Sequence, residues 1–273
     1  MKIALGVEYD GSAYSGWQIQ RHSPSVQAAL EAALSRVADH PVAVWCAGRT
    51  DAGVHAAAQV VHFESDAVRS ARAWVLGTNA NLPPAVAVRW AQAVPAHFNA
   101  RFSATARRYR YLLANQPSRP ALWHGRMSWE FRPLDLPAMA RAAASLLGEH
   151  DFSSFRAAGC QAKNPVRTLR HLDIARSGTC VAFTLEANAF LHHMVRNIVG
   201  ALLEVGRRER PEPWIAELLD ARDRRLAGVT APPDGLYLVG VQYPEEFGLP
   251  VEDCATGLLP VENHLYRSAA SMG

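Results

Sequence analysis

The chain has 273 residues, of which 49% are hydrophobic and 19% are charged, a balance typical of one large globular domain or two of ordinary size. Its net charge of +3 gives little indication of a partner. Its four cysteines are scattered without a Cys-x-x-Cys pair and indicate neither a zinc site nor a disulfide framework. The N-terminus lacks the features of a signal peptide, and the longest nearly apolar run, 198–205, is too short to span a bilayer.

The first hundred residues predict the element order β-α-β-β-α-β. Strands are expected over 3–9, 42–46, 59–63 and 86–94, and helices over 26–37 and 71–77. Ser25 is a good N-cap for the first helix. This order is the split arrangement of a ferredoxin-like domain.

The second half loosely repeats the order, although not the sequence. It predicts strands over 105–114, 169–175, 181–187 and 236–243, and helices over 136–147, 190–205 and 213–219. We therefore expect an N-terminal half over 1–104 and a C-terminal half over 105–246. Residues 247–273 lack periodicity and are expected to be an extension on the surface or without order.

Positive charge is unevenly distributed and consists almost entirely of arginine. Residues 67–129 contain no Asp or Glu but nine arginines, and the acid-free run 152–172 carries three arginines and Lys163. Genomic base composition can produce an arginine bias. Segregated guanidinium groups are nevertheless typical of nucleic-acid binders, so we expect nucleic acid rather than a membrane as the partner.

A glycine-flanked loop, 47–56, lies between two of the predicted strands and contains Arg49 and Asp51. An aspartate in a turn often only caps its own backbone. The segment Gly48-Arg49-Thr50-Asp51-Ala52-Gly53-Val54-His55-Ala56, however, closely resembles the catalytic signature of the tRNA pseudouridine synthase A family. The resemblance implies that Asp51 is the nucleophile and that Arg49 replaces or supports a flipped nucleotide. The alternative for Arg49 is an ordinary phosphate contact.

Arg196 is the second candidate, because its predicted helix is apolar on nearly every side. A buried arginine needs a partner. A structural ion pair could form with Glu186 or Glu204. A functional pair would form with Asp51 and hold that carboxylate ionised, as a nucleophile must be. The segment also resembles the Arg-bearing helix of the same family, where such a pair is expected.

Tyr109 lies in an arginine-rich strand, 106–111, that resembles the family's second motif. Strand tyrosines usually pack in the core. The resemblance implies that Tyr109 packs on the target base and assists proton removal, and stacking on an extruded base is physically sound. Tyr111 lies on the same face and competes for this role.

A metal site is not expected. His192 and His193 are adjacent, so on a helix they would point about 100° apart, whereas the helical metal signature needs a spacing of four. His55 and His62 are two further histidines, but no nearby carboxylate or cysteine completes a ligand set with them.

The three motifs and a resemblance that runs from Lys2 to about Pro244 identify the chain as a member of this family. The resemblance implies an α+β fold of two ferredoxin-like halves, joined through a mixed, mainly antiparallel sheet with a central active-site cleft. It implies isomerisation of uridine to pseudouridine in the anticodon stem-loop of tRNA, at tRNA positions 38 to 40, by a homodimer without a cofactor. The lack of a signal peptide and of a membrane-spanning run predicts a cytoplasmic protein.

Two other functions stay open on the residues alone. A non-catalytic RNA-binding module would need only the two halves and the arginines, although it has no use for a carboxylate facing a polyanion. A carboxylate glycosidase would require a second Asp or Glu near Asp51 as general acid, and the motif regions offer none.

Overall fold

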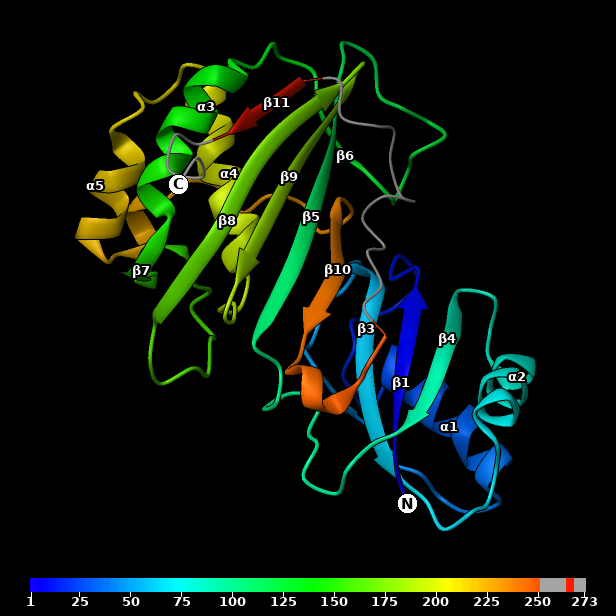
Figure 1. Ribbon diagram of the computed structural model, residues 1–273. Coiled ribbons are helices and arrows are strands. Elements are labelled where there is room, and N and C mark those ends of the chain that lie inside the picture. Colours follow the sequence, from blue (N-terminus) through cyan, green and yellow to red (C-terminus); the bar gives the residue numbers. More distant parts are fainter. Residues whose placement is uncertain (251–263, 268–273) are drawn as a thin grey trace. The chain divides into compact units, whose positions relative to one another are not determined.

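The computed structural model describes residues 1–250 and 264–267, which form an α+β fold whose strands pair mainly antiparallel (Figure 1). The contacts divide it into two units. Residues 1–107 and 237–250 belong to the first unit, and residues 108–236 and 264–267 to the second. The predicted boundary at Ala104 stays a prediction, because contacts within a folded chain do not define separately folding domains. No helix in these described ranges is long and apolar enough to cross a membrane.

The first unit has the predicted order β-α-β-β-α-β, followed by a strand from late in the chain. Its elements are β1 (Lys2–Tyr9), α1 (Val26–Ala38), β2 (Trp45–Cys46), β3 (His55–Glu64), α2 (Ala71–Asn81), β4 (Val86–Ala93) and β10 (Leu236–Gln242). The strands lie in the order β10-β3-β1-β4, with β2 paired to β3. β1 is antiparallel to both neighbours, and β10 runs parallel to β3. α1 and α2 pack side by side, and α2 contacts β4 (Figure 1).

The second unit contains the remaining strands and three helices. These are β5 (Ala106–Asn115), β6 (Ser128–Glu130), α3 (Leu136–Ala143), β7 (Gly148–Asp151), β8 (Val166–Ser177), β9 (Cys180–Ala187), α4 (Met194–Gly206), α5 (Trp214–Ala221) and β11 (His264–Arg267). The main strand order is β11-β8-β9-β5, with β6 on β5 and β7 on β8. α3 packs against both α4 and β8. The sequence did not predict β6, β7 or β11, because three or four residues are too few to show alternation.

A side-chain cap begins α1 where the sequence predicts. The Ser25 hydroxyl accepts a hydrogen bond from the N–H of Ala28 at 3.3 Å and starts α1. The same helix shortens the predicted strand 42–46 to β2. The N–H groups of Val42 and Val44 donate, at 2.9 Å each, to α1 side chains rather than to a neighbouring strand. Only Trp45–Cys46 therefore joins the sheet.

The helix predicted over 190–205 begins four residues late, at Met194. His193 precedes it with a φ of 60°, in the left-handed region, so the chain turns there before the helix starts. The apolar pattern of Phe190 and Leu191 belongs to this turn and not to α4.

The extension predicted over 247–273 is described only in part. Residues 251–263 and 268–273 lie outside the described residues. Within it, β11 pairs antiparallel with β8, with Leu265 opposite Ala175. The chain thus returns to the second unit and adds a strand to its sheet.

Candidate active site

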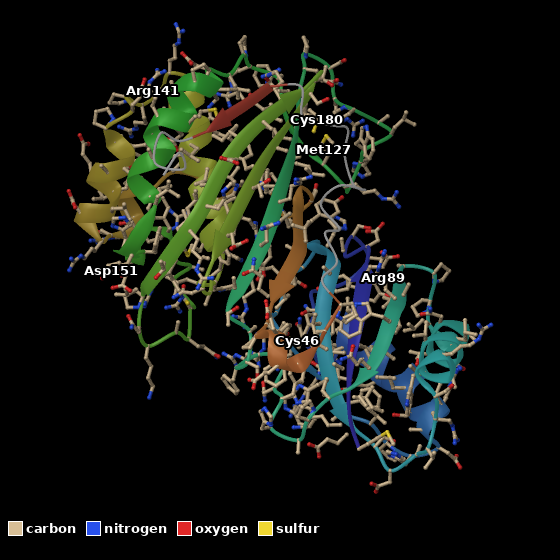
Figure 2. All side chains as sticks on the ribbon, in the orientation of Figure 1. Cys46, Arg89, Met127, Arg141, Asp151 and Cys180 are labelled. Carbon is tan, nitrogen blue, oxygen red and sulfur yellow. The ribbon has the colours of Figure 1, made fainter. Side chains whose placement is uncertain are left out.

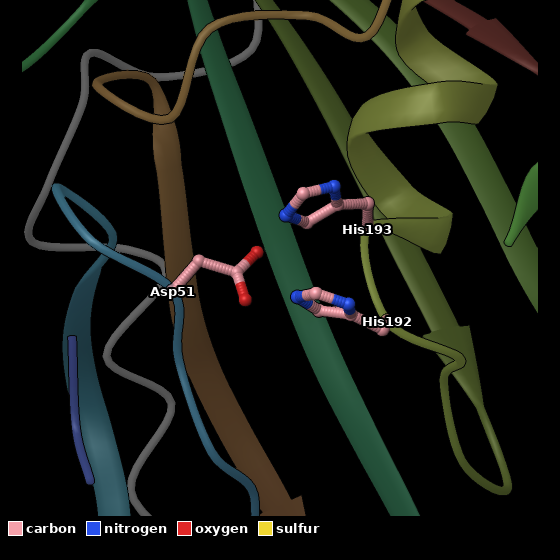
Figure 3. Close-up of side chains that lie close together, drawn as sticks. All are labelled: Asp51, His192 and His193. Carbon is pink, nitrogen blue, oxygen red and sulfur yellow. The ribbon is translucent and has the colours of Figure 1, made fainter. Parts of the chain in front are cut away.

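Asp51 lies in the loop between β2 and β3, and its side chain is half-buried (Figure 3). The segment that follows β1 binds this loop on both sides of the aspartate. The N–H of Trp17 donates to the carbonyl of Thr50 at 3.0 Å, and the N–H of Gly53 donates to the carbonyl of Tyr14 at 3.3 Å. These bonds satisfy backbone groups that a loop would otherwise leave to water, and they fix the backbone around Asp51.

Gln59 of β3 supports the same loop from beneath. It is fully buried, at 0% exposed. Its side-chain amide donates to the carbonyl of Gly48 at 2.7 Å and accepts from the N–H of Gly48 at 3.4 Å. Beside it, the hydroxyls of Thr50 and Tyr9 lie 2.7 Å apart. Side chains from β1 and β3 therefore hold the residues just before Asp51.

Two glycines let the segment after β1 approach the loop closely. Gly16 has a φ of +99°, and a Cβ there would lie 2.7 Å from the carbonyl oxygen of Thr50 and 3.1 Å from the carbonyl carbon of Asp51. A Cβ on Gly11 would collide with the backbone of Val54. Both positions therefore require glycine, and the absence of side chains is what brings the two backbones together.

The histidines on β3 have packing roles. Nδ1 of His55 lies 3.0 Å from the N–H of Gly11, and its ring stacks on Tyr237 with centroids 4.5 Å apart. Nδ1 of His62 accepts from the N–H of Ala100 at 3.1 Å. Burial lowers the pKa of His62 to about 4, so its ring is neutral at physiological pH.

A buried arginine anchors the start of the loop. The guanidinium of Arg107 donates to the carbonyls of Ala47 and Ala104 at 3.0 Å each and to that of Arg101 at 2.5 Å. Ala47 also packs in a hydrophobic cluster around Phe98. Arg107, one of the arginines in the acid-free run, therefore serves the fold.

Two residues that precede Asp51 in sequence, Arg49 and Cys46, differ in their accessibility and charge. Arg49 is exposed. Cys46, at the end of β2 (Figure 2), is largely enclosed, and burial raises the pKa of its thiol to about 12 despite the nearby charge of Arg49. The thiol is therefore protonated at neutral pH, so it does not compete with the carboxylate as a nucleophile.

α4 of the second unit is buried at every position except Arg196 and Glu204. Nε of Arg196 donates to the carbonyl of Ala231 at 2.8 Å, and the N–H of Ala231 donates back to the carbonyl of Arg196 at 3.1 Å. Gly200 of the same helix has no room for a Cβ against the backbone of Val229. The half-buried guanidinium is thus held in one orientation against the segment 229–231.

The two carboxylates considered as structural partners of Arg196 each contact another arginine. Glu186 lies 2.8 Å from Arg108, and Glu204 lies 3.6 Å from Arg210. The pair between Arg196 and Asp51 stays a prediction.

The two tyrosines of β5 differ in their surroundings. Tyr111 is fully buried, and its hydroxyl donates to the Pro232 carbonyl at 3.0 Å and lies 2.6 Å from the hydroxyl of Ser128. Tyr109 is 8% exposed, and its ring meets the ring of Phe190 edge-on with centroids 5.1 Å apart. Both tyrosines are buried, but the hydroxyl of Tyr111 is bound within the core, so Tyr109 stays the candidate for stacking on a base.

His192 and His193 do not lie on a helix, although the sequence predicts one over 190–205. They form the turn before α4 (Figure 3), and their ring centroids are 4.0 Å apart with the planes tilted by 41°. The expected separation of about 100° between them is wrong, because it assumed helical geometry.

The comparison with known protein families identifies the class. The model of the tRNA pseudouridine synthase family matches residues 6–103 and 142–244, which include the Asp51 loop and α4. The chain therefore belongs to the tRNA pseudouridine synthase family. This confirms the resemblance found in the sequence. The Tyr109 strand lies between the two matched segments.

Within the family, the chain is similar to proteins named tRNA pseudouridine synthase A. The protein from Pectobacterium atrosepticum is 59% identical over 250 residues, which cover 92% of this chain and 88% of that protein. Those from Citrobacter koseri and Enterobacter sp. (strain 638) are each 59% identical over 249 residues, covering 91% of this chain and 92% of theirs.

Sequence reasoning missed the residues that support Asp51. The sequence predicts Gln59 and Tyr9 only as strand residues, and it gives no role to Gly16. The sequence does contain a signal for Gln59. The period-2 alternation of its strand places it on the inward, apolar face, where an amide needs hydrogen-bond partners. The close approach at Gly16 depends on a contact distant in sequence, which no local pattern reveals.

Proposed function

We propose that this protein converts uridine to pseudouridine in the anticodon stem-loop of tRNA, at the positions 38 to 40 implied by the family resemblance. Membership of the tRNA pseudouridine synthase family, with relatives named tRNA pseudouridine synthase A, supports an isomerase that acts on tRNA uridines. The choice of the anticodon stem-loop is the more specific part of the proposal.

Asp51 is the proposed nucleophile, and the observation that carries this assignment is the rigidity of its loop. Backbone bonds from 14–17, the Gln59 amide and the contacts of two glycines fix its position. A preorganised carboxylate can form a transient covalent adduct with the uridine without a metal or cofactor. The N1–C1′ bond breaks, a C5–C1′ bond forms, the proton on C5 is lost and N1 gains a proton.

The other site residues have supporting roles in the proposal. Arg49, which is exposed, replaces or supports the nucleotide that leaves the stack. Tyr109 packs on the extruded base. Arg196 keeps the Asp51 carboxylate ionised through its charge. We further propose that the protein works as a homodimer in the cytoplasm, since a stem-loop must be held away from the reacting base.

The decisive experiment uses unmodified tRNA transcript labelled with tritium at C5 of uridine, which pseudouridine formation releases. Asp51→Asn should release no tritium above background yet bind the transcript at least as tightly as the parent, because one negative charge facing the RNA is removed. Asp66→Asn, which neutralises an exposed loop aspartate of the same unit, is the matched control and should keep full activity.

Tritium release by Asp51→Asn at the parent rate would overturn the nucleophile assignment. If the parent protein released no tritium from any tRNA yet bound tRNA, a non-catalytic RNA-binding module would be the better account.

A further inference from the structure

We propose that a basic pocket in the second unit, formed between residues 153–158 and 222–224, is a binding site for a phosphate group. The pocket has a volume of about 280 Å³ and is lined by Ser153, Arg156, Arg222, Asp223 and Arg224 together with two alanines. None of these residues belongs to the Asp51, Tyr109 or Arg196 motifs. The volume lies just below the range of about 300–1,000 Å³ that holds whole drug-sized ligands, which suits a phosphate with part of a nucleoside.

The charge in the pocket favours an anion. The lining contains three arginines and one carboxylate, that of Asp223, and a second carboxylate, that of Asp151, lies 3.8 Å from Arg222. The Asp223 carboxylate is already engaged, because Arg225 binds it with Nη2 at 2.6 Å and Nε at 3.0 Å. These hydrogen bonds lower the pKa of Asp223 to about 2, so it stays ionised and bound to Arg225. Planar guanidinium groups are well suited to the geometry of a phosphate.

Two arginines of the pocket are available to a ligand. Within residues 1–250 and 264–267, the Arg156 side chain makes no hydrogen bond or ion pair, and Arg222 lies 3.8 Å from Asp151 while 68% of its side chain is exposed. Arg222 also has a φ of 49°, in the left-handed region where helix ends usually place glycine.

The two walls of the pocket are held together by one buried residue of α4. Nδ2 of Asn197 donates to the Phe155 carbonyl at 2.7 Å on one wall, and its Oδ1 accepts from Arg224 at 3.1 Å and from Thr230 at 2.6 Å on the other. Asn197 is 2% exposed. The N–H of Ala157 donates to the carbonyl of His192, just before the same helix, at 2.9 Å. Both walls of the pocket are therefore tied to the first turn of α4.

Asn197 follows Arg196 directly in α4, so the pocket and the Arg196 guanidinium share one rigid framework. A phosphate of the RNA backbone bound in the pocket would fix the position of the RNA relative to Arg196. This source of the phosphate rests on the proposed tRNA substrate, whereas a free nucleotide or inorganic phosphate would need only the pocket.

The test compares the parent protein with the double variant Arg156→Gln/Arg222→Gln. Arg224 is left unchanged, because it bonds Ala227, Asn197 and Thr230 and its loss would disturb the fold. Arg141→Gln removes one exposed guanidinium of α3 in the same unit and serves as the control (Figure 2). Two quantities are measured for each protein: the dependence of the tRNA dissociation constant on salt, and the melting temperature in phosphate against chloride at constant ionic strength.

If the site binds a phosphate of tRNA, the salt dependence of tRNA affinity should weaken in the double variant. The magnitude of the slope of the logarithm of the dissociation constant against log[salt] should fall by about 0.7–0.9 for each phosphate that an arginine no longer neutralises, and it should stay unchanged in Arg141→Gln. For a free phosphate, inorganic phosphate should raise the melting temperature of the parent and of Arg141→Gln but not of the double variant, with the tRNA slope unchanged. Either result supports a phosphate site and identifies its source.

A double variant that matches the parent in both measurements overturns the proposal. Neither measurement requires turnover. A parent protein that fails to release tritium would therefore contradict the proposed isomerase without affecting the outcome for the phosphate site.

Discussion

The Gln59 side chain shows at the scale of a single residue how the Asp51 loop is held. One amide group satisfies both the donor and the acceptor of the Gly48 peptide. An apolar side chain of similar volume cannot replace it, because two partly buried backbone groups would lose their partners, at a cost of up to about 1–3 kcal/mol each.

Replacing Gln59 by leucine should therefore lower kcat for tritium release by about 10- to 100-fold, since each ~1.4 kcal/mol of lost positioning is tenfold in rate. The dissociation constant for tRNA should change by less than threefold, because Gln59 is enclosed. Gln92→Leu, which removes hydrogen bonds to the carbonyls of Phe247 and Gly248 but none to Gly48, is the control. An unchanged kcat in Gln59→Leu would show that the loop tolerates movement.

The two tyrosines of β5 make a second prediction about single residues. Tyr111→Phe should lose about 1 kcal/mol of unfolding free energy, because two hydrogen bonds to its hydroxyl disappear, and should keep its activity. Tyr109→Leu should lose most of its activity, since stacking on a base is worth about 1–3 kcal/mol, and should also lose some stability, because its ring packs against Phe190. Denaturant unfolding and tritium release measure the two effects, and the opposite pattern would assign the base to Tyr111.

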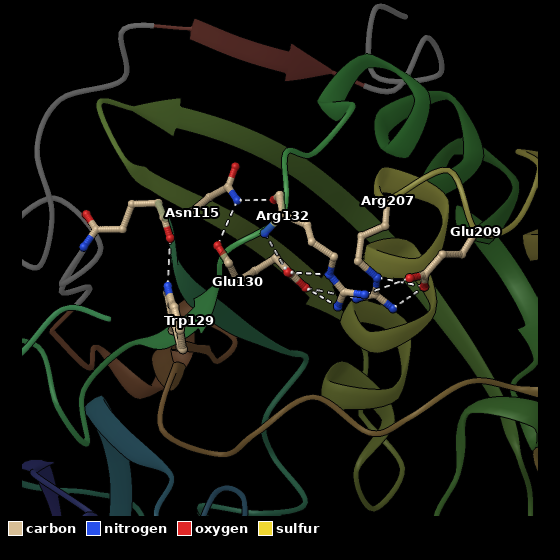
Figure 4. Close-up of polar contacts among 7 residues, drawn as sticks. Asn115, Trp129, Glu130, Arg132, Arg207 and Glu209 are labelled. Carbon is tan, nitrogen blue, oxygen red and sulfur yellow. Dashed lines mark hydrogen bonds and ion pairs between the residues drawn. The ribbon is translucent and has the colours of Figure 1, made fainter. Parts of the chain in front are cut away.

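A network of charged side chains joins two elements of the second unit. Glu130 at the end of β6 bonds Arg132 at 2.8 Å and Arg207, which follows α4, at 3.2 Å (Figure 4). Glu209 contacts both arginines at 2.8 Å. Burial alone would raise the pKa of Glu130, but hydrogen bonds from Arg132 and the charges of both arginines outweigh it, and the pKa is lowered.

This network predicts a pH dependence of stability. Because the pKa of Glu130 is lower in the folded than in the unfolded protein, its contribution is fully present above the ordinary carboxyl pKa of about 4.5 and is lost as the pH falls through the lower, folded value. The melting temperature of the parent should therefore fall more steeply between about pH 5 and pH 3 than that of Glu130→Gln. Equal slopes would mean that the charges do not stabilise the native state.

Local sequence signals predicted most elements, and the exceptions have identifiable causes. Ser25, the alternation in β5 and the apolar α4 were sufficient for element type and order. The strand at 42–46 was overestimated because the α1 side chains that bind its N–H groups cannot be inferred from its own residues. The start of α4 was misplaced because the left-handed φ of His193 carries no signal in a residue that is neither glycine nor asparagine.

The residues of the candidate site were likewise found where the signal is local in sequence and missed where it is not. Asp51 and Arg49 were found because their motif is contiguous in sequence. Gln59 and Gly16 were missed because their importance lies in contacts with residues far along the chain. Arg107 was grouped with the RNA-facing arginines, yet three backbone carbonyls surround it. Charge counted along a sequence does not separate structural guanidinium groups from exposed ones.

For the whole molecule, the proposed homodimer makes a prediction of mass. Light scattering after size-exclusion chromatography should give twice the 29.8 kDa of the chain at micromolar concentration. This mass is expected for the protein without tRNA, because the two chains are proposed to associate with each other directly. A mass of one chain under these conditions would contradict the homodimer.

The cysteines offer a way to observe the basic pocket directly. Burial raises the pKa values of both Cys46 and Cys180 (Figure 2), so their thiolates are scarce at neutral pH. Cys160 follows the pocket, and its N–H donates to the carbonyl of Ala157 in the pocket wall. In a Cys254→Ser background, an environment-sensitive fluorophore should therefore attach first at Cys160. The native sequence thus already contains an attachment point for an optical reporter of ligand binding, within a few residues of Arg156.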